Sequence, residues 1–182
     1  EHFLAAVSGL GLDNLQVEVD GEEMPILDGS ALPIWEALKR AGVVSQNVPV
    51  KPLRITERLD LSREGVTLIA EPTPEEGLTL EVGISFPYPG LENGSFSFKM
   101  GNEAKDEDFE NRLAGSRTFC FEKEVEALRS RGLIQGGSLE CGVVLGSRGP
   151  MNGPLRFEDE LVRHKTLDLL GDLMLLNRPL WG

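Results

Sequence analysis

The sequence predicts an α+β fold of two units, and three observations lead to this prediction. Helix-spaced and period-two apolar patterns both occur before residue 46. Both patterns occur again after residue 52, where several short strand-like runs precede a long helical run. Between them, residues 46–52 contain two prolines and no periodicity, which is typical of a linker. We therefore expect one domain over residues 1–48 and a second over residues 49–182.

The first unit reads as helix, strand and helix. Residues 1–10 have apolar side chains at the spacing of one helix face, and Gly11 follows as a stop signal. Residues 15–19 alternate apolar and polar side chains, the period of a half-buried strand. Ser30 is a suitable N-cap for a helix over residues 31–41.

The second unit begins with strands separated by turn residues and ends with a long helix. We expect strands at residues 53–59, 66–71, 78–86, 95–100 and 139–145. We expect helices at residues 107–113, 122–131 and 158–176.

The composition argues against nucleic acid as a partner and indicates the cellular compartment. A formal net charge of −12 argues against nucleic-acid binding, which needs a basic surface. An acidic protein can still contain a local basic pocket that binds a phosphorylated small molecule. Cys120 and Cys141 can form at most one disulfide, and we interpret them as thiols in a reducing compartment. The sequence contains neither an apolar run near the ~18 residues of a membrane span nor a signal-peptide pattern. We expect a cytoplasmic monomer.

The two histidines of the chain, with one aspartate, predict a metal site. His164 and Asp168 stand four residues apart on the last helix, so their side chains project from one face. With His2 they would supply two imidazoles and one carboxylate, a Zn²⁺ ligand set that leaves a position for water. Glu1, beside His2, is placed to act as the general base. The alternative is an ordinary surface His–Asp pair, which the spacing alone does not exclude.

Several segments, in order, resemble one family of enzymes. EHFLAAVSGLGLDNL at residues 1–15 resembles the E-H-L-x-A-A segment of the UDP-3-O-acyl-N-acetylglucosamine deacetylases, zinc hydrolases of lipid A synthesis. PILDGSA at residues 25–31 resembles the family's P-I-x-D-G-S turn. Further matches, spread over nearly the whole chain, are RTF at 117–119, GGSL at 136–139, LRFEDE at 155–160, RHK at 163–165 and GDL at 171–173.

The resemblance implies a role for each residue of the metal site. The family's zinc ligands fall on His2, His164 and Asp168, and its general base falls on Glu1. The implied fold is two α+β sandwich domains, each a mixed or antiparallel sheet packed with helices, with zinc near the interface. Three further positions carry implied roles: Thr118 stabilises the oxyanion, Lys165 holds substrate phosphates, and Asp172 orients a histidine of a K-x-G-H segment.

The resemblance also implies a substrate-binding surface. Phe86 matches an aromatic residue that stacks on the uracil ring, and Phe119 lies near the mouth of a hydrophobic passage for the acyl chain. The residues implied to line that passage are Val125, Gly137, Ser138, Leu139 and Cys141. Ordinary core packing is the alternative for each of them.

The implied reaction is zinc-dependent deacetylation of UDP-3-O-acyl-N-acetylglucosamine, the committed step of lipid A biosynthesis. The sequence departs from the family pattern in opening on Glu1 without a methionine and in reaching Gly182 before the K-x-G-H segment. We therefore expect a chain shortened at both ends. The alternative function is a fragment or homologue that binds zinc and the sugar nucleotide without turnover.

Overall fold

The computed structural model describes residues 1–86, 88, 93–101, 106–125 and 140–182. The helices are α1 (His2–Gly9), α2 (Leu32–Ala41), α3 (Asp106–Phe109), the π-helix η1 (Glu110–Ala114), α5 (Glu160–Leu173) and the 3₁₀ helix η2 (Met174–Leu176). Residues 122–125 are helical as well. The strands are β1 (Leu53–Arg54), β2 (Leu59–Arg63), β3 (Val66–Ala70), β4 (Leu78–Ile84), β5 (Gly94–Met100), β6 (Phe119–Phe121), β7 (Val143–Gly146), β8 (Gly149–Pro150) and β9 (Leu180–Trp181).

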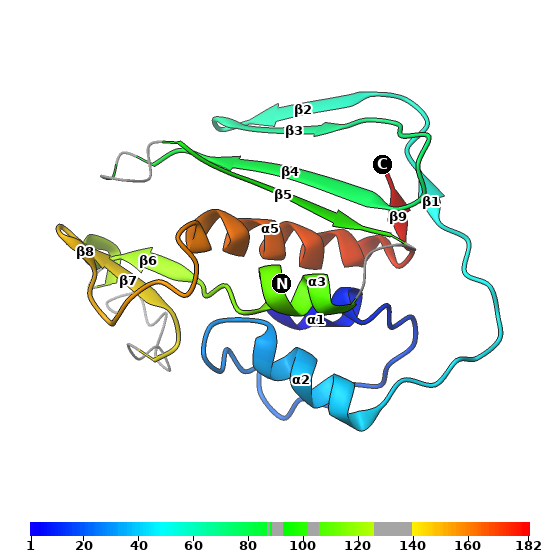
Figure 1. Ribbon diagram of the computed structural model, residues 1–182, viewed down its shortest axis with the longest axis horizontal. Helices are drawn as coiled ribbons and strands as arrows, with labels where there is room; N and C mark the ends of the chain where they lie inside the picture. Colours follow the sequence, from blue (N-terminus) through cyan, green and yellow to red (C-terminus); the bar gives the residue numbers. More distant parts are fainter. Residues whose placement is uncertain (87, 89–92, 102–105, 126–139) are drawn as a thin grey trace.

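The elements are arranged in layers (Figure 1). The hairpin β2–β3 lies above the hairpin β4–β5, and α5 runs beneath β4–β5. On the other side of α5 lie α1 and α3, with α2 farthest from the hairpins. The sheet β6–β7–β8 lies beside the start of α5, and the parallel pair β1–β9 lies beside its end. The predicted α+β class is confirmed.

The hairpin β4–β5 buries one face against α5. Its antiparallel register places Leu80 opposite Phe98 and Val82 opposite Phe96, so these side chains share one face of the ribbon. Leu80, Phe96 and Phe98 are at most 8% exposed. Polar residues alternate with them and lie on the other face, as expected for an antiparallel pair with one buried face.

Helix α5 is enclosed because β4 and β5 pack on one side and α1 on the other. Gly171 permits the approach of α1: a Cβ there would lie only 2.2 Å from the carbonyl oxygen of Glu1. Glycine is therefore required where the start of α1 crosses the backbone of α5. This crossing brings the first residues of the chain to the face of α5 that carries His164 and Asp168.

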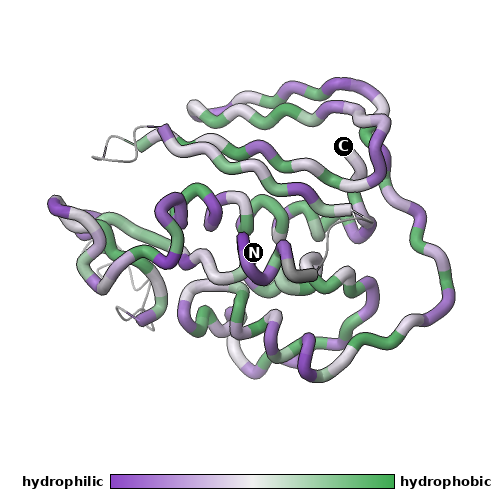
Figure 2. Tube along the Cα trace, viewed as in Figure 1, coloured by the Kyte–Doolittle hydropathy of each residue, from purple (hydrophilic) through white to green (hydrophobic). Residues whose placement is uncertain are grey.

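One hydrophobic core joins the two predicted units. It contains Ala5 and Trp35 from the first unit and Leu80, Phe98 and Leu170 from the second. Residues 42–52 between them form no helix or strand. Figure 2 shows hydrophobic positions in this linker as well, so apolar residues are not confined to the core. The division after residue 48 stays a prediction.

Several predicted elements were wrong or displaced. Residues 15–19 form no strand, and Leu15, Val17 and Val19 are 44–45% exposed, because no strand among the described residues lies alongside to pair with their backbone. The predicted strand at 53–59 is only two residues long, as β1, and β2 begins where it was expected to end. The structural N-cap of α2 is Ala31 rather than Ser30, although the Ser30 hydroxyl accepts a hydrogen bond from the Leu32 N–H at 3.3 Å.

Candidate metal centre

His2, His164 and Asp168 bring three potential ligand atoms together. Nε2 of His2 lies 3.3 Å from Nε2 of His164 and 3.7 Å from Oδ1 of Asp168. Nε2 of His164 lies 3.3 Å from the same carboxylate oxygen. His2 begins α1 and the other two lie one turn apart on α5, so the packing of these two helices creates the cluster.

The histidines are set to act as neutral ligands. Nδ1 of His164 lies 3.0 Å from the carbonyl oxygen of Ser116, which only accepts hydrogen bonds, so Nδ1 carries the proton and Nε2 presents its lone pair. Burial lowers the pKa of His164 to about 4, and the nearby Asp168 only partly offsets this. Burial also lowers the pKa of His2.

The distances fit a single tetrahedral metal ion. Two ligands that each lie 2.0–2.1 Å from Zn²⁺ in a tetrahedral arrangement are separated by roughly 3.3–3.4 Å. The observed separations are 3.3, 3.3 and 3.7 Å. A lone pair of His164 and an anionic oxygen of Asp168 facing each other would repel without a cation between them. The donor set therefore forms a group suited to hold a metal ion.

The second oxygen of Asp168 is held by Lys165. The Lys165 ammonium donates to Oδ2 of Asp168 at 2.8 Å and lies 5.5 Å from the ring centre of Phe119. Oδ1 is thereby left to face the histidines. Lys165 itself is 43% exposed, so it borders the site rather than filling it.

An aromatic cluster lies beside the metal group. Phe119 of β6 meets the His164 ring edge-on at 6.5 Å between ring centres. Phe86, just after β4, contacts Phe119 and Phe121 with ring centres 5.8 and 5.6 Å apart. Tyr88 packs on Phe121 and donates a hydrogen bond to the carbonyl of Gly146. Two of the predicted substrate-binding residues, Phe86 and Phe119, therefore lie together next to the predicted ligands.

Two further carboxylates, those of Glu1 and Asp172, lie near the metal group. Glu1 is the exposed N-cap of α1, and its backbone lies against Gly171. Asp172 follows Gly171, and partial burial raises its pKa, with further contributions from the negative charges of Glu1 and Asp168. The carboxylates of Glu1, Asp168 and Asp172 therefore lie close enough together for the first two to raise the pKa of Asp172.

Thr118 is anchored through its backbone. Its N–H donates to the carbonyl of Gly29 at 2.7 Å, and its own carbonyl accepts from the N–H of Val143 at 2.7 Å. Gly29 has φ of +82°, and a Cβ there would lie 2.3 Å from the carbonyl oxygen of Cys141. The turn at residues 28–30 therefore fits only with glycine at its centre, and it holds Thr118, the residue before β6, through the hydrogen bond to Gly29.

The remaining predicted lining residues divide into two groups. Val125, in a helical stretch described over residues 122–125, and Cys141 are both partly buried. Gly137, Ser138 and Leu139 lie outside the described residues. The predicted helix at 122–131 and strand at 139–145 are thus described only over residues 122–125 and 140–145, and β7 begins at Val143.

Sequence reasoning gave no role to several residues that are held by hydrogen bonds between distant parts of the chain. The Ser116 carbonyl fixes the His164 ring, but a backbone oxygen leaves no signal in residue type. Glu160 is 0% exposed and binds Arg117 across 43 positions of sequence. Arg156 donates to Asp28 at 2.8 Å across 128 positions, which lowers the pKa of that carboxyl despite partial burial.

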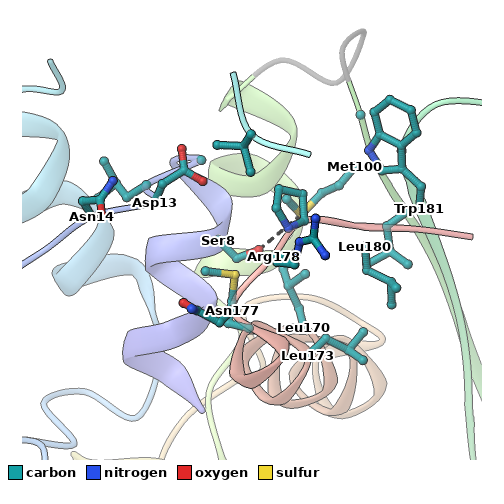
Figure 3. Close-up of a pocket in the computed structure, with 18 residues that line it drawn as sticks. Ser8, Asp13, Asn14, Met100, Leu170, Leu173, Asn177, Arg178, Leu180 and Trp181 are labelled. Carbon is teal, nitrogen blue, oxygen red and sulfur yellow. Dashed lines mark hydrogen bonds between the residues drawn. The ribbon is translucent and has the colours of Figure 1, made fainter. Parts of the chain in front are cut away.

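A separate pocket of about 460 Å³ lies at the far ends of α1 and α5 (Figure 3). Figure 3 shows Ser8 facing Met100, with Leu170 and Leu173 below and Arg178 beside them. None of the three residues of the metal group lines this pocket.

The comparisons with known proteins agree with the geometry. The family model described as LpxC, UDP-3-O-acyl N-acetylglycosamine deacetylase, matches residues 1–182. Curated UDP-3-O-acyl-N-acetylglucosamine deacetylases of Oleidesulfovibrio alaskensis and Thermosynechococcus vestitus are 42% and 44% identical over 100% and 98% of this chain. The corresponding enzyme of Myxococcus xanthus is 40% identical over the whole chain.

The chain spans 58%, 60% and 56% of the lengths of these three relatives. Within the described residues, no helix has the length and apolar character needed to cross a bilayer. The family match nevertheless covers every residue of the sequence. The chain belongs to the UDP-3-O-acyl N-acetylglycosamine deacetylase (LpxC) family.

Proposed function

We propose that the protein removes the N-acetyl group of UDP-3-O-acyl-N-acetylglucosamine by metal-dependent hydrolysis, as a cytoplasmic monomer of the lipid A pathway. The observation that carries this proposal is the convergence of His2, His164 and Asp168, with separations that suit one zinc ion. Membership of the family supplies the substrate class.

A bound Zn²⁺ would act as a Lewis acid and lower the pKa of a water molecule to about 7. Glu1, next to His2, would accept a proton from the attacking water. The Thr118 hydroxyl would donate a hydrogen bond to the acetamide oxygen as negative charge develops on it. Transfer of a proton to the nitrogen as the C–N bond breaks would then give acetate and the free 2-amino sugar.

The surroundings support roles in holding the substrate. Lys165 is a partly exposed cation at the edge of the metal group, suited to a phosphate oxygen. Phe86 and Phe119 offer aromatic faces for the uracil ring and the mouth of the acyl passage. Val125 and Cys141 are proposed to line that passage together with Gly137, Ser138 and Leu139. Asp172 is proposed to orient the partner acid of the reaction.

Zinc content tests the ligand set. Mass spectrometry of the full-length protein should find one tightly held zinc in the wild type. Asp168→Asn keeps the shape of the side chain but removes its charge, so it should lose most of the metal. Glu158→Gln, an exposed carboxylate change just before α5, is the matched control and should keep it. A wild-type protein without zinc would refute the proposed mechanism.

Turnover tests the general base. Acetate release from the acylated sugar nucleotide should fall at least about 100-fold in Glu1→Gln, the scale of general-base catalysis, while zinc content stays constant. Glu18→Gln, an exposed change in the first unit, is the control. Undiminished turnover in Glu1→Gln would remove Glu1 from the mechanism. Zinc binding without any acetate release from the wild type would favour the non-catalytic binding function instead.

A further inference from the structure

Glu160 is a completely buried carboxylate one turn before His164 on α5. It is 0% exposed, and both of its oxygens accept hydrogen bonds. Oε1 accepts from the Arg117 backbone N–H at 3.0 Å and from Arg117 Nε at 2.8 Å. Oε2 accepts from the Arg156 backbone N–H at 2.6 Å and from Arg117 Nη2 at 3.2 Å. The charge is therefore fully satisfied within the protein.

A single peptide group connects Glu160 to the metal site. The N–H of Arg117 and the C=O of Ser116 belong to the same planar peptide unit, and they point in opposite directions. The N–H donates to Glu160, and the C=O accepts from Nδ1 of His164 at 3.0 Å. Glu160 and His164 stand four residues apart on one face of α5, so this helix face holds the peptide at both of its polar ends.

This arrangement affects His164 in two ways. It fixes the position of the carbonyl oxygen, which keeps the proton on Nδ1 and the lone pair of Nε2 directed at His2 and Asp168. Hydrogen bonds in a chain also polarise one another, so a carboxylate on the N–H makes the carbonyl a stronger acceptor. A stronger acceptor at Nδ1 makes Nε2 a better metal ligand.

The energetics of burial do not by themselves explain why an ion pair stands at this position. A buried ion pair such as Glu160–Arg117 is weak evidence for stability, since apolar replacements of similar volume often do as well. Arg117 is itself only 12% exposed and also donates to the Pro154 carbonyl at 3.0 Å. Its side chain and its peptide N–H both converge on one carboxylate next to the metal group.

We propose that Glu160 is a positioning residue of the metal site, which holds the Ser116–Arg117 peptide so that His164 is kept as the Nδ1–H tautomer with Nε2 facing the metal. The proposal rests on the ligand set of the proposed function. It adds a carboxylate, acting through one backbone peptide, to the residues that control metal binding.

The test compares Glu160→Gln with a matched change at the neighbouring residue in the full-length protein. Glu160→Gln preserves the shape but removes the charge and exchanges one acceptor oxygen for a donor. Asp159→Asn is the control, because Asp159 pairs with Arg163 at the same helix end. Zinc affinity is measured by competition with a chromophoric chelator. Glu160→Gln should bind zinc at least about 10-fold more weakly, as is usual for residues that orient metal ligands. Asp159→Asn should match the wild type.

A spectroscopic readout separates positioning from general stability. Nitrogen-15 NMR of the His164 ring in metal-free protein should show a single Nδ1–H tautomer in the wild type and in Asp159→Asn. Glu160→Gln should show a mixture. Arg117→Lys keeps the peptide N–H and a cation near Glu160, so its tautomer and zinc affinity should lie closer to the wild type than those of Glu160→Gln.

Each result decides the proposal. A folded Glu160→Gln protein with wild-type zinc affinity and a single tautomer overturns it. If Glu160→Gln does not fold, an Nε2–H tautomer in the metal-free wild type still overturns it without any variant. Both readouts are made without substrate, so a wild type that holds zinc but releases no acetate refutes the proposed activity alone. A wild type that binds no zinc refutes both.

Discussion

Replacing Gly171 by alanine would test the close packing of α1 on α5 without changing any of the proposed metal ligands. The new Cβ would lie 2.2 Å from the Glu1 carbonyl oxygen, 2.8 Å from its carbon and 3.0 Å from its Cα. All of these atoms are backbone, so no side-chain rotation relieves the contact. Non-bonded heavy atoms prefer separations of about 3.5 Å, so the start of α1 must move away by roughly 1 Å.

This displacement affects metal binding more than stability. His2 directly follows Glu1 and moves with it, while ligand distances tolerate only about 0.2 Å. We expect zinc affinity to fall on the order of 10- to 100-fold. Alanine gains about 1 kcal/mol over glycine in a helix, and overpacking costs about 1–3 kcal/mol. The free energy of unfolding should therefore fall by only about 0–2 kcal/mol.

Two measurements on the full-length protein check this reasoning. Zinc affinity is obtained by chelator competition, and the free energy of unfolding by urea denaturation of metal-free protein. Gly21→Ala is the control, because the nearest atom to its Cβ is a carbonyl oxygen 3.9 Å away. Wild-type zinc affinity in Gly171→Ala would show that the contact between α1 and α5 does not position His2.

Three other predictions address the site and the core. The free energy of unfolding of metal-free protein should fall by up to about 3 kcal/mol between pH 6.5 and pH 4, because the pKa of His164 is about 4 in the folded protein and the unfolded chain therefore binds a proton at higher pH. Urea titrations at several pH values check this, and His164→Ala should not show the loss. Thr118→Val should lower kcat for acetate release about 100-fold with zinc content unchanged, and an unaltered kcat would remove its hydroxyl from oxyanion stabilisation. Phe98→Ala should cost about 3–5 kcal/mol of unfolding free energy in urea, because the ring is 1% exposed; a cost below about 1 kcal/mol would contradict its place in the core.

The spacing of apolar residues predicted helices and strands that pack one face against a neighbouring element. It failed for strands whose existence depends on pairing with a distant part of the chain. The last helix was expected at residues 158–176 and is seen as α5 and η2, because its apolar residues follow the helical period. Leu15, Val17 and Val19 have the period of a strand but no partner among the described residues. Conversely, β9 is two residues long and exists only through its pairing with β1, which no local pattern reveals.

The site shows the same division. His164 and Asp168 could be grouped from their helical spacing alone. His2, 162 positions away, entered as the other histidine of the chain, and the family motif then gave it the role of a ligand. Neither source gave a role to Ser116, because it acts through a carbonyl, or to Glu160, which lies in the LRFEDE match but has its partner on a distant loop. Backbone acceptors and buried ion pairs are fixed by tertiary structure, so a single sequence does not display them.

The long separation between the two histidines has a consequence for synthesis. His2 emerges 162 residues before His164, a delay of roughly 8–32 s at ~5–20 residues per second. During that interval α1 has no α5 to cover Ala5 and Ala6, which are fully buried in the finished protein. A nascent chain released before residue 164 would carry only one of the three proposed ligands. Metal binding by all three proposed ligands would therefore become possible only once the part of α5 that carries His164 and Asp168 has been made.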